Sequence, residues 1–329
     1  LLMMGISTSI IGILPPAASA GVGVVIVLQL MRLAQCFGRG GTWGGGILMA
    51  YENVPENKRS FYAAIPQIGL PIGFGLSSIL IAVPTLLLPE DIFFTWGWRI
   101  PFLAAIILTL IVIRQKGEMM ETEDYKKAQA KLEAEEAEGK KHKVGFIPMV
   151  KGYWKTLLLG CGTRWVDGTF YNIFIVWILS YCINWLGMPL IQTYIITIIA
   201  CIFKIPFTLF GGWCAQKLGN TRTFVIGALA SAVLSIPTLK VIELSKGNLA
   251  ITIIGIVLGW SIAYNLIWAV ISSLWSSYFE TEVRYSGISF VYHVPSFLVA
   301  GMVPTICTLL INYGKGDTIY VGIYSTVVA

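Results

Sequence analysis

The stretch that decides the fold is Asn248–Phe279, NLAITIIGIVLGWSIAYNLIWAVISSLWSSYF. It runs for 32 residues without a charged side chain and shows no strict alternation of apolar and polar residues. A helix needs about 20 mostly apolar residues to cross a bilayer, whereas a strand of a membrane barrel needs about 10 residues in strict alternation. The stretch therefore predicts a membrane-spanning helix.

Other runs repeat this pattern along the chain. Ser60–Pro89 is free of charge over 30 residues, and Tyr285–Gly314 carries only His293. Prolines, glycines and charges between the runs predict spans near 22–50, 60–88, 95–114, 154–185, 190–213, 222–242, 249–278 and 285–312. Two shorter apolar pieces, 1–14 and one that begins near Thr318, flank them. The fold class predicted is all-α, a polytopic membrane helix bundle.

Composition excludes several other classes of protein. Only 12% of the 329 residues are charged, about half the average of about 25% in soluble domains. Between Gln115 and Lys151 lie 16 of the 40 charges, which leaves 24 in the other 292 residues, too few for a hydrated globular surface. A disordered chain, a disulfide scaffold and a nucleic-acid-binding protein are therefore excluded. The six cysteines stand singly, without CxxC spacing, which favours packing over metal binding: Cys36, Cys161, Cys182, Cys201, Cys214 and Cys307.

Basic residues predict the orientation in the membrane. Lys and Arg are enriched in cytoplasmic loops. If the charged loop 115–152 is cytoplasmic, the loops on its side hold 15 of the 23 basic residues. The opposite loops hold four: Arg99, Lys240, Lys246 and Lys315. We therefore expect a multi-pass protein of a bacterial-type plasma (inner) membrane with the loop 115–152 in the cytoplasm.

The charged loop also predicts the division of the chain. Within it, Glu118–Lys143 is rich in Glu, Lys and Ala, and Glu123 and Lys127 have helical i,i+4 spacing, which is typical of a solvated helix or a flexible connector. Its near balance of charge argues against a nucleic-acid-binding arm. Four apolar segments precede the loop and six follow it, so we expect an N-terminal half that comprises residues 1–114 and a C-terminal half that comprises residues 153–329.

Four strings, in this order, resemble a known family. They are Arg32–Gly45 (RLAQCFGRGGTWGG), Glu52–Arg59 (ENVPENKR), Trp96–Phe102 (WGWRIPF) and Arg284–Gly287 (RYSG). Together they resemble the metabolite:proton symporter branch of the major facilitator superfamily, which includes permeases for proline and betaine, 2-oxoglutarate, citrate and shikimate. The resemblance implies two six-helix halves, of which this chain lacks the first two helices and has the last incomplete.

Two departures from the family pattern each remove a carboxylate. The family usually has Glu where Thr42 stands, and Asp where Gln216 stands in the loop after the eighth helix. By resemblance, that loop is a gating loop at the cytoplasmic side, with Gly212, Gln216, Lys217 and Gly219 as its motif residues. These changes put in doubt the usual proton chemistry of the fourth helix and the usual charge latch at the gate.

Charged residues within spans mark candidate pathway residues, because a charge inside a bilayer is costly. Arg32 lies 10 residues into its span, about 15 Å deep at about 1.5 Å per residue, and Arg39 shares its face. We expect Arg32 to line the central cavity; a structural Arg bonded to carbonyl groups is the alternative. Gln67 is a weaker cavity candidate.

The seventh helix carries the most informative cluster. Arg164, Asp167 and Tyr171 are spaced i, i+3 and i+7, so they share one face near the middle of the span. The functional interpretation is that Asp167 titrates while Arg164 binds an anionic group. The alternative is an intrahelical ion pair that serves packing alone. Lys204 is expected to extend its stem to the cytoplasmic interface, with a substrate role as the less favoured possibility.

We therefore expect a secondary active transporter, and the sequence contains no catalytic constellation of an enzyme. The predicted activity is proton-coupled symport of a small organic acid or zwitterionic metabolite by a monomer, with no cofactor, metal or nucleic acid. The alternatives are a sugar facilitator of the same superfamily and a non-transporting membrane sensor with this fold. A sugar site needs no buried ion pair, so Arg164 and Asp167 favour a charged metabolite.

Overall fold

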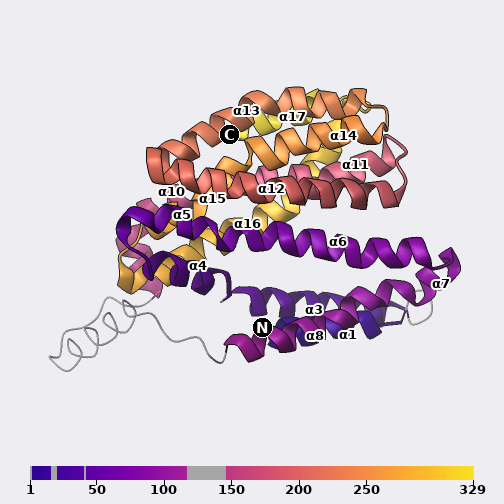
Figure 1. Ribbon diagram of the computed structural model, residues 1–329, viewed down its shortest axis with the longest axis horizontal. Coiled ribbons are helices and arrows are strands. Elements are labelled where there is room, and N and C mark those ends of the chain that lie inside the picture. Colours follow the sequence, from indigo (N-terminus) through magenta and orange to yellow (C-terminus); the bar gives the residue numbers. More distant parts are fainter. Residues whose placement is uncertain (1, 16–20, 41, 117–145) are drawn as a thin grey trace. The chain divides into compact units, whose positions relative to one another are not determined.

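The described residues of the chain form helices and their connections, and they contain no strand (Figure 1). A computed structural model describes residues 2–15, 21–40, 42–116 and 146–329. The helices up to the charged loop are α1 (Leu2–Ile13), α3 (Val22–Gly40), α4 (Thr42–Glu52), η1 (Glu56–Lys58), α5 (Arg59–Ala64), η2 (Pro66–Ile68), α6 (Gly69–Leu87), α7 (Glu90–Thr95), η3 (Gly97–Arg99) and α8 (Ile100–Lys116). Those after it are α10 (Phe146–Tyr171), η4 (Asn172–Trp177), α11 (Ile178–Asn184), α12 (Leu190–Leu218), α13 (Asn220–Leu244), α14 (Leu249–Ile256), η5 (Val257–Ala263), α15 (Asn265–Ser276), α16 (Thr281–Tyr313) and α17 (Ile319–Val328).

Eight helical segments among the described residues are long and apolar enough to cross a membrane. They are Val22–Glu52, Glu56–Leu87, Gly97–Arg114, Met149–Asn184, Leu190–Leu218, Asn220–Leu244, Leu249–Ser276 and Val283–Tyr313. Each contains or overlaps one of the eight spans predicted from the sequence, and the two short apolar pieces are helices as well. The predicted class, a polytopic membrane helix bundle, is confirmed.

The helices form two compact units, and the first comprises the described residues of 1–46 and 76–121. In it, α1 packs on both α3 and α8. Glycines bring these helices close: a Cβ at Gly12 would lie 2.7 Å from Phe102, and one at Gly38 would lie 2.7 Å from Met4. In lipid, where helices gain little from apolar burial, such small residues favour association by close packing.

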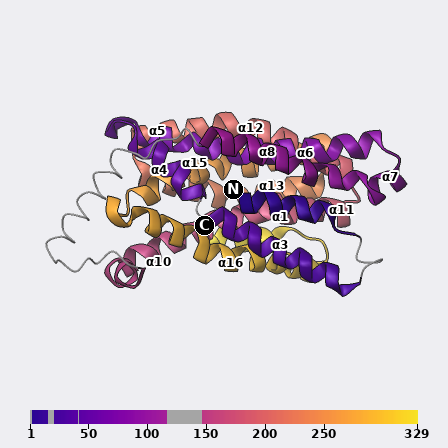
Figure 2. The same cartoon turned by 90° about the horizontal axis from the view of Figure 1, so that it is seen from below.

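The second unit comprises residues 47–75 and the described residues of 122–329. In it α10 packs on α16, α12 and α13 pack on α15, and α17 packs on α13 (Figures 1 and 2). Two of its spans contain a π-helical turn, η4 and η5. The turns meet where Gly259 faces the ring of Phe174, and any Cβ at this glycine would overlap the ring. Such turns insert an extra residue and often occur at functional sites.

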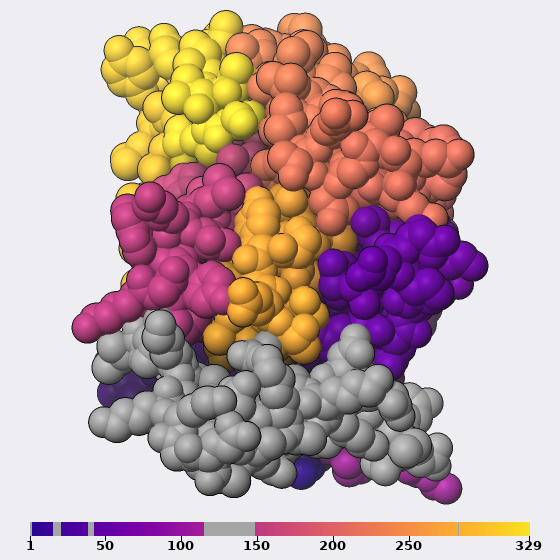
Figure 3. All heavy atoms as spheres, turned by 90° about the vertical axis from the view of Figure 1, so that its left-hand side faces the viewer, coloured from indigo at the N-terminus to yellow at the C-terminus, as the bar shows by residue number. Residues whose placement is uncertain are grey.

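Residues 47–75 pack against the C-terminal helices of the same unit. Ser272 Oγ donates to the carbonyl of Ala63 at 2.8 Å, and a Cβ at Gly212 would lie 2.6 Å from the Cβ of Ala64. The purple residues of this segment accordingly lie beside the orange and coral helices in Figure 3. Glu52, at the end of α4, accepts a hydrogen bond of 2.8 Å from Arg284. Backbone, small side chains and an ion pair therefore all contribute to this contact.

The predicted charged loop is mostly beyond what the structure describes. Residues 117–145, with the helix or connector expected at Glu118–Lys143, lie outside the described residues. The described ends of the loop belong to α8 and α10. The division into an N-terminal half (residues 1–114), a cytoplasmic loop (residues 115–152) and a C-terminal half (residues 153–329) stays a prediction.

Candidate functional site

A buried ion pair lies in the middle of α10. Arg164 and Asp167, one helical turn apart, form a salt bridge between the guanidinium Nη1 and the carboxylate Oδ2. Asp167 is fully buried, and only 9% of Arg164 is exposed. The i,i+3 spacing in the sequence predicts this pairing, because it places both side chains on one face of a helix. Removing either partner alone would leave a buried charge uncompensated.

Other helices complete the hydrogen bonds of this pair. The Tyr264 hydroxyl donates to Asp167 Oδ1 at 2.6 Å, so both carboxylate oxygens are occupied. Arg164 Nε donates to Ser296 Oγ at 2.9 Å, and the guanidinium lies 4.3 Å from the centroid of the Tyr292 ring. The network therefore joins α10 to α16 and to the residue between η5 and α15. Tyr264, Ser296 and Tyr292 were not predicted, because their contacts cross between helices.

Lys204 contradicts the sequence prediction, since it does not reach an interface. Its side chain is fully buried, and its ammonium lies 4.5 Å from the ring of Trp260 and 4.4 Å from the ring of Tyr264. Its Nζ donates to the Trp260 carbonyl at 3.4 Å. Lys204 is 14 residues from each end of α12, about 21 Å at about 1.5 Å per residue, which its stem cannot cover. That central position was the signal in the sequence.

Two predicted pathway residues lie at the edge of this cluster. The Tyr171 ring packs edge-on against Phe74 of α6, with 6.1 Å between the ring centroids. Gln67 is buried and donates from Nε2 to the carbonyl of Trp268 at 3.3 Å, while Trp268 Nε1 donates to the Gln67 carbonyl at 3.1 Å. Gln67 thus joins η2 to α15 and does not contact the ion pair.

Arg32 lies on α3 of the first unit and is exposed. The structure does not test its predicted place in a central cavity. The side chains of Arg39 and Thr42 lie outside the described residues. The pathway role of Arg32 therefore stays a prediction.

The predicted gating loop joins α12 to α13. Gly219 ends α12 with a φ of +91°, a left-handed conformation that favours glycine. Gly212 is buried against α5, whereas Gln216 and Lys217 are exposed. Asn220 at the start of α13 makes a polar tie next to this loop, because its Oδ1 accepts from Ser60 at 2.8 Å and from Ser273 at 3.0 Å.

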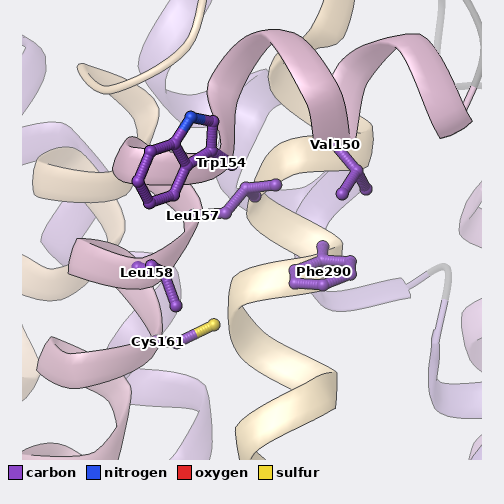
Figure 4. A pocket seen from close by; sticks show the side chains of 6 residues that line it. All are labelled: Val150, Trp154, Leu157, Leu158, Cys161 and Phe290. Atoms are coloured by element: carbon purple, nitrogen blue, oxygen red, sulfur yellow. The ribbon is translucent and has the colours of Figure 1, made fainter.

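A separate hollow of about 270 Å³ opens beside α10 and α16 (Figure 4). It is lined by Val150, Trp154, Leu157, Leu158, Cys161 and Phe290. These side chains offer no ionised group to a polar metabolite, and the ion pair is not among them. We therefore assign the candidate site to the polar cluster. Among the described residues no group of three or more His, Cys, Asp and Glu could hold a metal ion.

Comparison with known proteins identifies the family of this chain. Residues 1–308 match the family described as Major Facilitator Superfamily. The inner membrane metabolite transport protein YhjE of Escherichia coli is 31% identical over the whole chain, which covers 73% of that protein. The shikimate transporter of the same bacterium is 29% identical over 98% of this chain and 72% of its own length. The proline/betaine transporter of Salmonella typhimurium is 27% identical over the whole chain and 65% of its own length.

The fold also matches solved structures. A D-xylose-proton symporter superposes with a TM-score of 0.70 over 99% of this chain and 78% of its own, at 15% sequence identity. At that identity the match shows the fold alone. The resemblance noted in the sequence strings is confirmed, and the relatives named are transporters of metabolites, shikimate, and proline and betaine. This chain belongs to the Major Facilitator Superfamily and is an integral multi-pass membrane protein.

Proposed function

We propose that this chain acts as a proton-coupled symporter for a small organic acid or a zwitterionic metabolite and works by alternating access. The observation that carries the proposal is the Arg164–Asp167 pair, buried in the middle of a membrane span and bonded to Tyr264 and Ser296. A neutral sugar can be bound through amides and hydroxyls and needs no such pair. An anionic substrate, by contrast, needs a cation that can be released to it.

The ion pair supplies a coupling mechanism. While Asp167 is ionised, it occupies the guanidinium of Arg164. When a proton neutralises Asp167, that guanidinium becomes available to a carboxylate of the substrate, so proton binding and substrate binding favour each other. Tyr264 can hydrogen-bond Asp167 in either state, which keeps the carboxyl group oriented. Tyr171, Gln67 and Arg32 are proposed as further pathway residues.

The names of the relatives support this substrate class. Shikimate, proline and betaine, which the relatives are named for, each carry one carboxylate group. The solved xylose symporter bears on the fold alone, and the sugar for which it is named carries no charge. We therefore propose that the protein recognises the carboxylate group of its substrate rather than a sugar ring.

We propose that residues 47–75 close the cytoplasmic side. Glu52–Arg284, Ser60–Asn220 and the Ser272–Ala63 bond hold this segment against the C-terminal helices. Opening toward the cytoplasm requires these contacts to break, and the gating-loop residues Gly212, Gln216, Lys217 and Gly219 lie beside them. We further propose an inner-membrane location with the loop 115–152 in the cytoplasm, and a functional monomer that needs neither a cofactor nor nucleic acid.

Uptake into proteoliposomes tests the proposed function. The full protein is reconstituted, and uptake of labelled shikimate, proline, glycine betaine and xylose is measured with and without an inward proton gradient. Accumulation of at least one carboxylate that collapses when a protonophore is added supports the proposal. Gradient-independent equilibration of xylose alone would favour a sugar facilitator, and saturable binding of a probe without uptake would favour a sensor.

A further inference from the structure

Lys204 is a buried lysine that the mechanism above does not use. No carboxylate among the described residues forms a salt bridge with it, and its one hydrogen bond goes to the Trp260 carbonyl at 3.4 Å. The faces of Trp260 and Tyr264 cover the rest of the ammonium at 4.5 and 4.4 Å. Aromatic faces attract a desolvated cation but do not neutralise it. The ammonium has three donors, so it retains the capacity to bind an acceptor.

The charges of the cluster do not balance when Lys204 is ionised. Arg164 and Lys204 contribute two positive charges, and Asp167 contributes one negative charge. Both oxygens of Asp167 are already engaged, one by Arg164 and one by Tyr264. A buried charge is tolerated when it is paired. One further negative charge, held beside Lys204, would therefore lower the excess positive charge of the cluster, whether Asp167 is ionised or protonated.

A second donor without an acceptor lies in the same place. The indole Nε1 of Trp260 is buried and has no hydrogen-bond partner in the part of the chain that the structure describes. It belongs to the ring over which the Lys204 ammonium lies. Because an indole N–H only donates, leaving it dry and unpaired is unfavourable. An incoming acceptor that meets both groups would satisfy them together.

The backbone around Lys204 is held in place for this role. Asn265 Nδ2 donates to the Lys204 carbonyl at 2.9 Å, and Thr208 Oγ1 donates to the same carbonyl at 2.9 Å. Thr208 and Asn265 are also within hydrogen-bond distance of each other, at 3.1 Å. All of these residues are fully buried. The cation is thus presented from a fixed backbone, which reduces the loss of freedom on binding.

We propose that Lys204 Nζ and Trp260 Nε1 form the subsite for a single carboxylate group of the transported molecule. This inference rests on the proposed function and deepens it by naming the recognised group, because one carboxylate lowers the excess positive charge of the cluster and can accept from both donors. Arg164 and Asp167 remain the proton-linked pair, and the same carboxylate also accepts from Arg164 once Asp167 is protonated. A charge-assisted bond to a carboxylate is stronger than a neutral one, so Lys204 should distinguish an acid from its ester or amide.

Equilibrium binding to the full protein in nanodiscs tests the subsite. The probes are two matched pairs, shikimate with its methyl ester and proline with prolinamide. Lys204→Met should weaken binding of the acid by about tenfold or more and leave the ester or amide within about twofold. Trp260→Phe keeps an aromatic face for the ammonium but removes the N–H, so it should weaken the acid alone, by about threefold or more. Lys155→Met is the matched control, because exposed Lys155 lies 5.6 Å from the Trp154 ring.

Each outcome decides between the two proposals. Two results would overturn the subsite. One is an equal loss of affinity for the acid and for its ester or amide, and the other is unchanged binding of all four probes by both variants. If Lys204→Met cannot be purified, Trp260→Phe decides alone. Acid-selective binding that depends on Lys204, in a protein that shows no proton-driven uptake, would retain the subsite and reject the symporter. Proton-driven uptake by the parent protein of an acid that Lys204→Met binds as tightly as the parent would retain the symporter and reject the subsite.

Discussion

At the scale of single residues, Asp167 provides the sharpest test of the coupling mechanism. Asp167→Asn mimics the protonated carboxyl, so Arg164 is permanently available to the substrate. The variant should still bind substrate and exchange it between two pools, but its uptake should not respond to a pH gradient. Counterflow and gradient-driven uptake in the same proteoliposomes measure both properties. Undiminished gradient-driven accumulation by this variant would place the proton site elsewhere.

Arg164 allows a complementary prediction about affinity. Arg164→Lys keeps the positive charge but loses the planar fork that grips a carboxylate through two bonds. Affinity for an anionic substrate should fall by about tenfold, or about 1.4 kcal/mol, in equilibrium binding. Arg99→Lys is the control, since Arg99 bonds to backbone carbonyls of the first unit. An unchanged dissociation constant would leave the Arg164–Asp167 pair with a packing role.

Sequence reasoning identified some residues of this site and missed others. Arg164 and Asp167 could be predicted because their pairing is local to one helix. Tyr264 and Trp260 could not, since an aromatic residue in an apolar span is typical both of a site and of ordinary packing. The assignment of Lys204 to the interface is wrong, because its stem is too short to reach water. The central position of Lys204 in α12 argued against that assignment.

At the scale of helices, the contact between the two π turns is where added side-chain volume should affect stability most. A Cβ at Gly259 overlaps the ring of Phe174, which is itself 1% exposed and stacked on Phe170. Gly259→Ala should therefore lower the free energy of unfolding by about 1–3 kcal/mol. A thermal-unfolding scan in detergent measures the effect. Gly301→Ala on α16 is the control: a Cβ there meets nothing within 4 Å, so it should be neutral or stabilising by up to about 1 kcal/mol.

A polar cluster at the end of α13 makes folding stability depend on pH. Lys240 donates to Asp317 at 2.7 Å and to both oxygens of Glu243 at 3.0 Å. The hydrogen bond from Lys240 holds the pKa of Asp317 below its ordinary value. The ionised pair thus stabilises the fold fully above the unfolded pKa of about 4, and this stabilisation is lost as pH falls through the folded pKa.

The variant Asp317→Asn tests that dependence. At neutral pH it should lose at most about 1 kcal/mol, because the pair is partly exposed. The difference in Tm between parent and variant should shrink as pH falls below about 4, since the parent then loses the same charge. Asp91→Asn, at an exposed residue, is the control, and its difference in Tm from the parent should not shrink in this way. A difference in Tm that stays constant down to acid pH would contradict the predicted linkage.

Helix positions were far more predictable than helix irregularities. Length and charge suffice for a span, because lipid imposes a minimum apolar run and penalises charge. The π turns meet through Gly259 and Phe174, which are 85 positions apart in the chain, so no local pattern predicts that contact. The polar tie of Asn220 to Ser60 and Ser273 likewise joins residues that are far apart in the chain, so no local pattern predicts it.

At the scale of the whole molecule, the first prediction concerns orientation. In a variant without the native cysteines, a cysteine at Lys151 should be protected from a membrane-impermeant maleimide in intact cells, and one at Asp91 should react. Permeabilised cells provide the control, since both sites should then be labelled. The reverse pattern would contradict the orientation derived from the basic residues, and with it the cytoplasmic gate.

The second prediction at this scale concerns the gate. Glu52→Gln leaves the guanidinium of Arg284, which is 14% exposed, without its carboxylate. We expect the segment 47–75 to separate more often, so that a cysteine at buried Ala63 reacts several-fold faster with a permeant maleimide. Exchanging the pair, Glu52→Arg with Arg284→Glu, should restore slow labelling. Glu56→Gln is the control, because it breaks only the exposed pair with Arg59.

The two π turns also affect how the spans that contain them are aligned with related sequences. Such a turn is the mark that a one-residue insertion leaves inside a helix, since the chain absorbs the extra residue without lengthening the span. Beyond each turn the side chains are rotated by about 100° from where an unbroken α-helix would place them. The helical phase therefore changes at η5. If Leu249–Ser276 is aligned without a gap to an unbroken α-helix, the residues on one side of η5 are assigned to the wrong helix face. The ancestry of this span is best traced through its two halves separately.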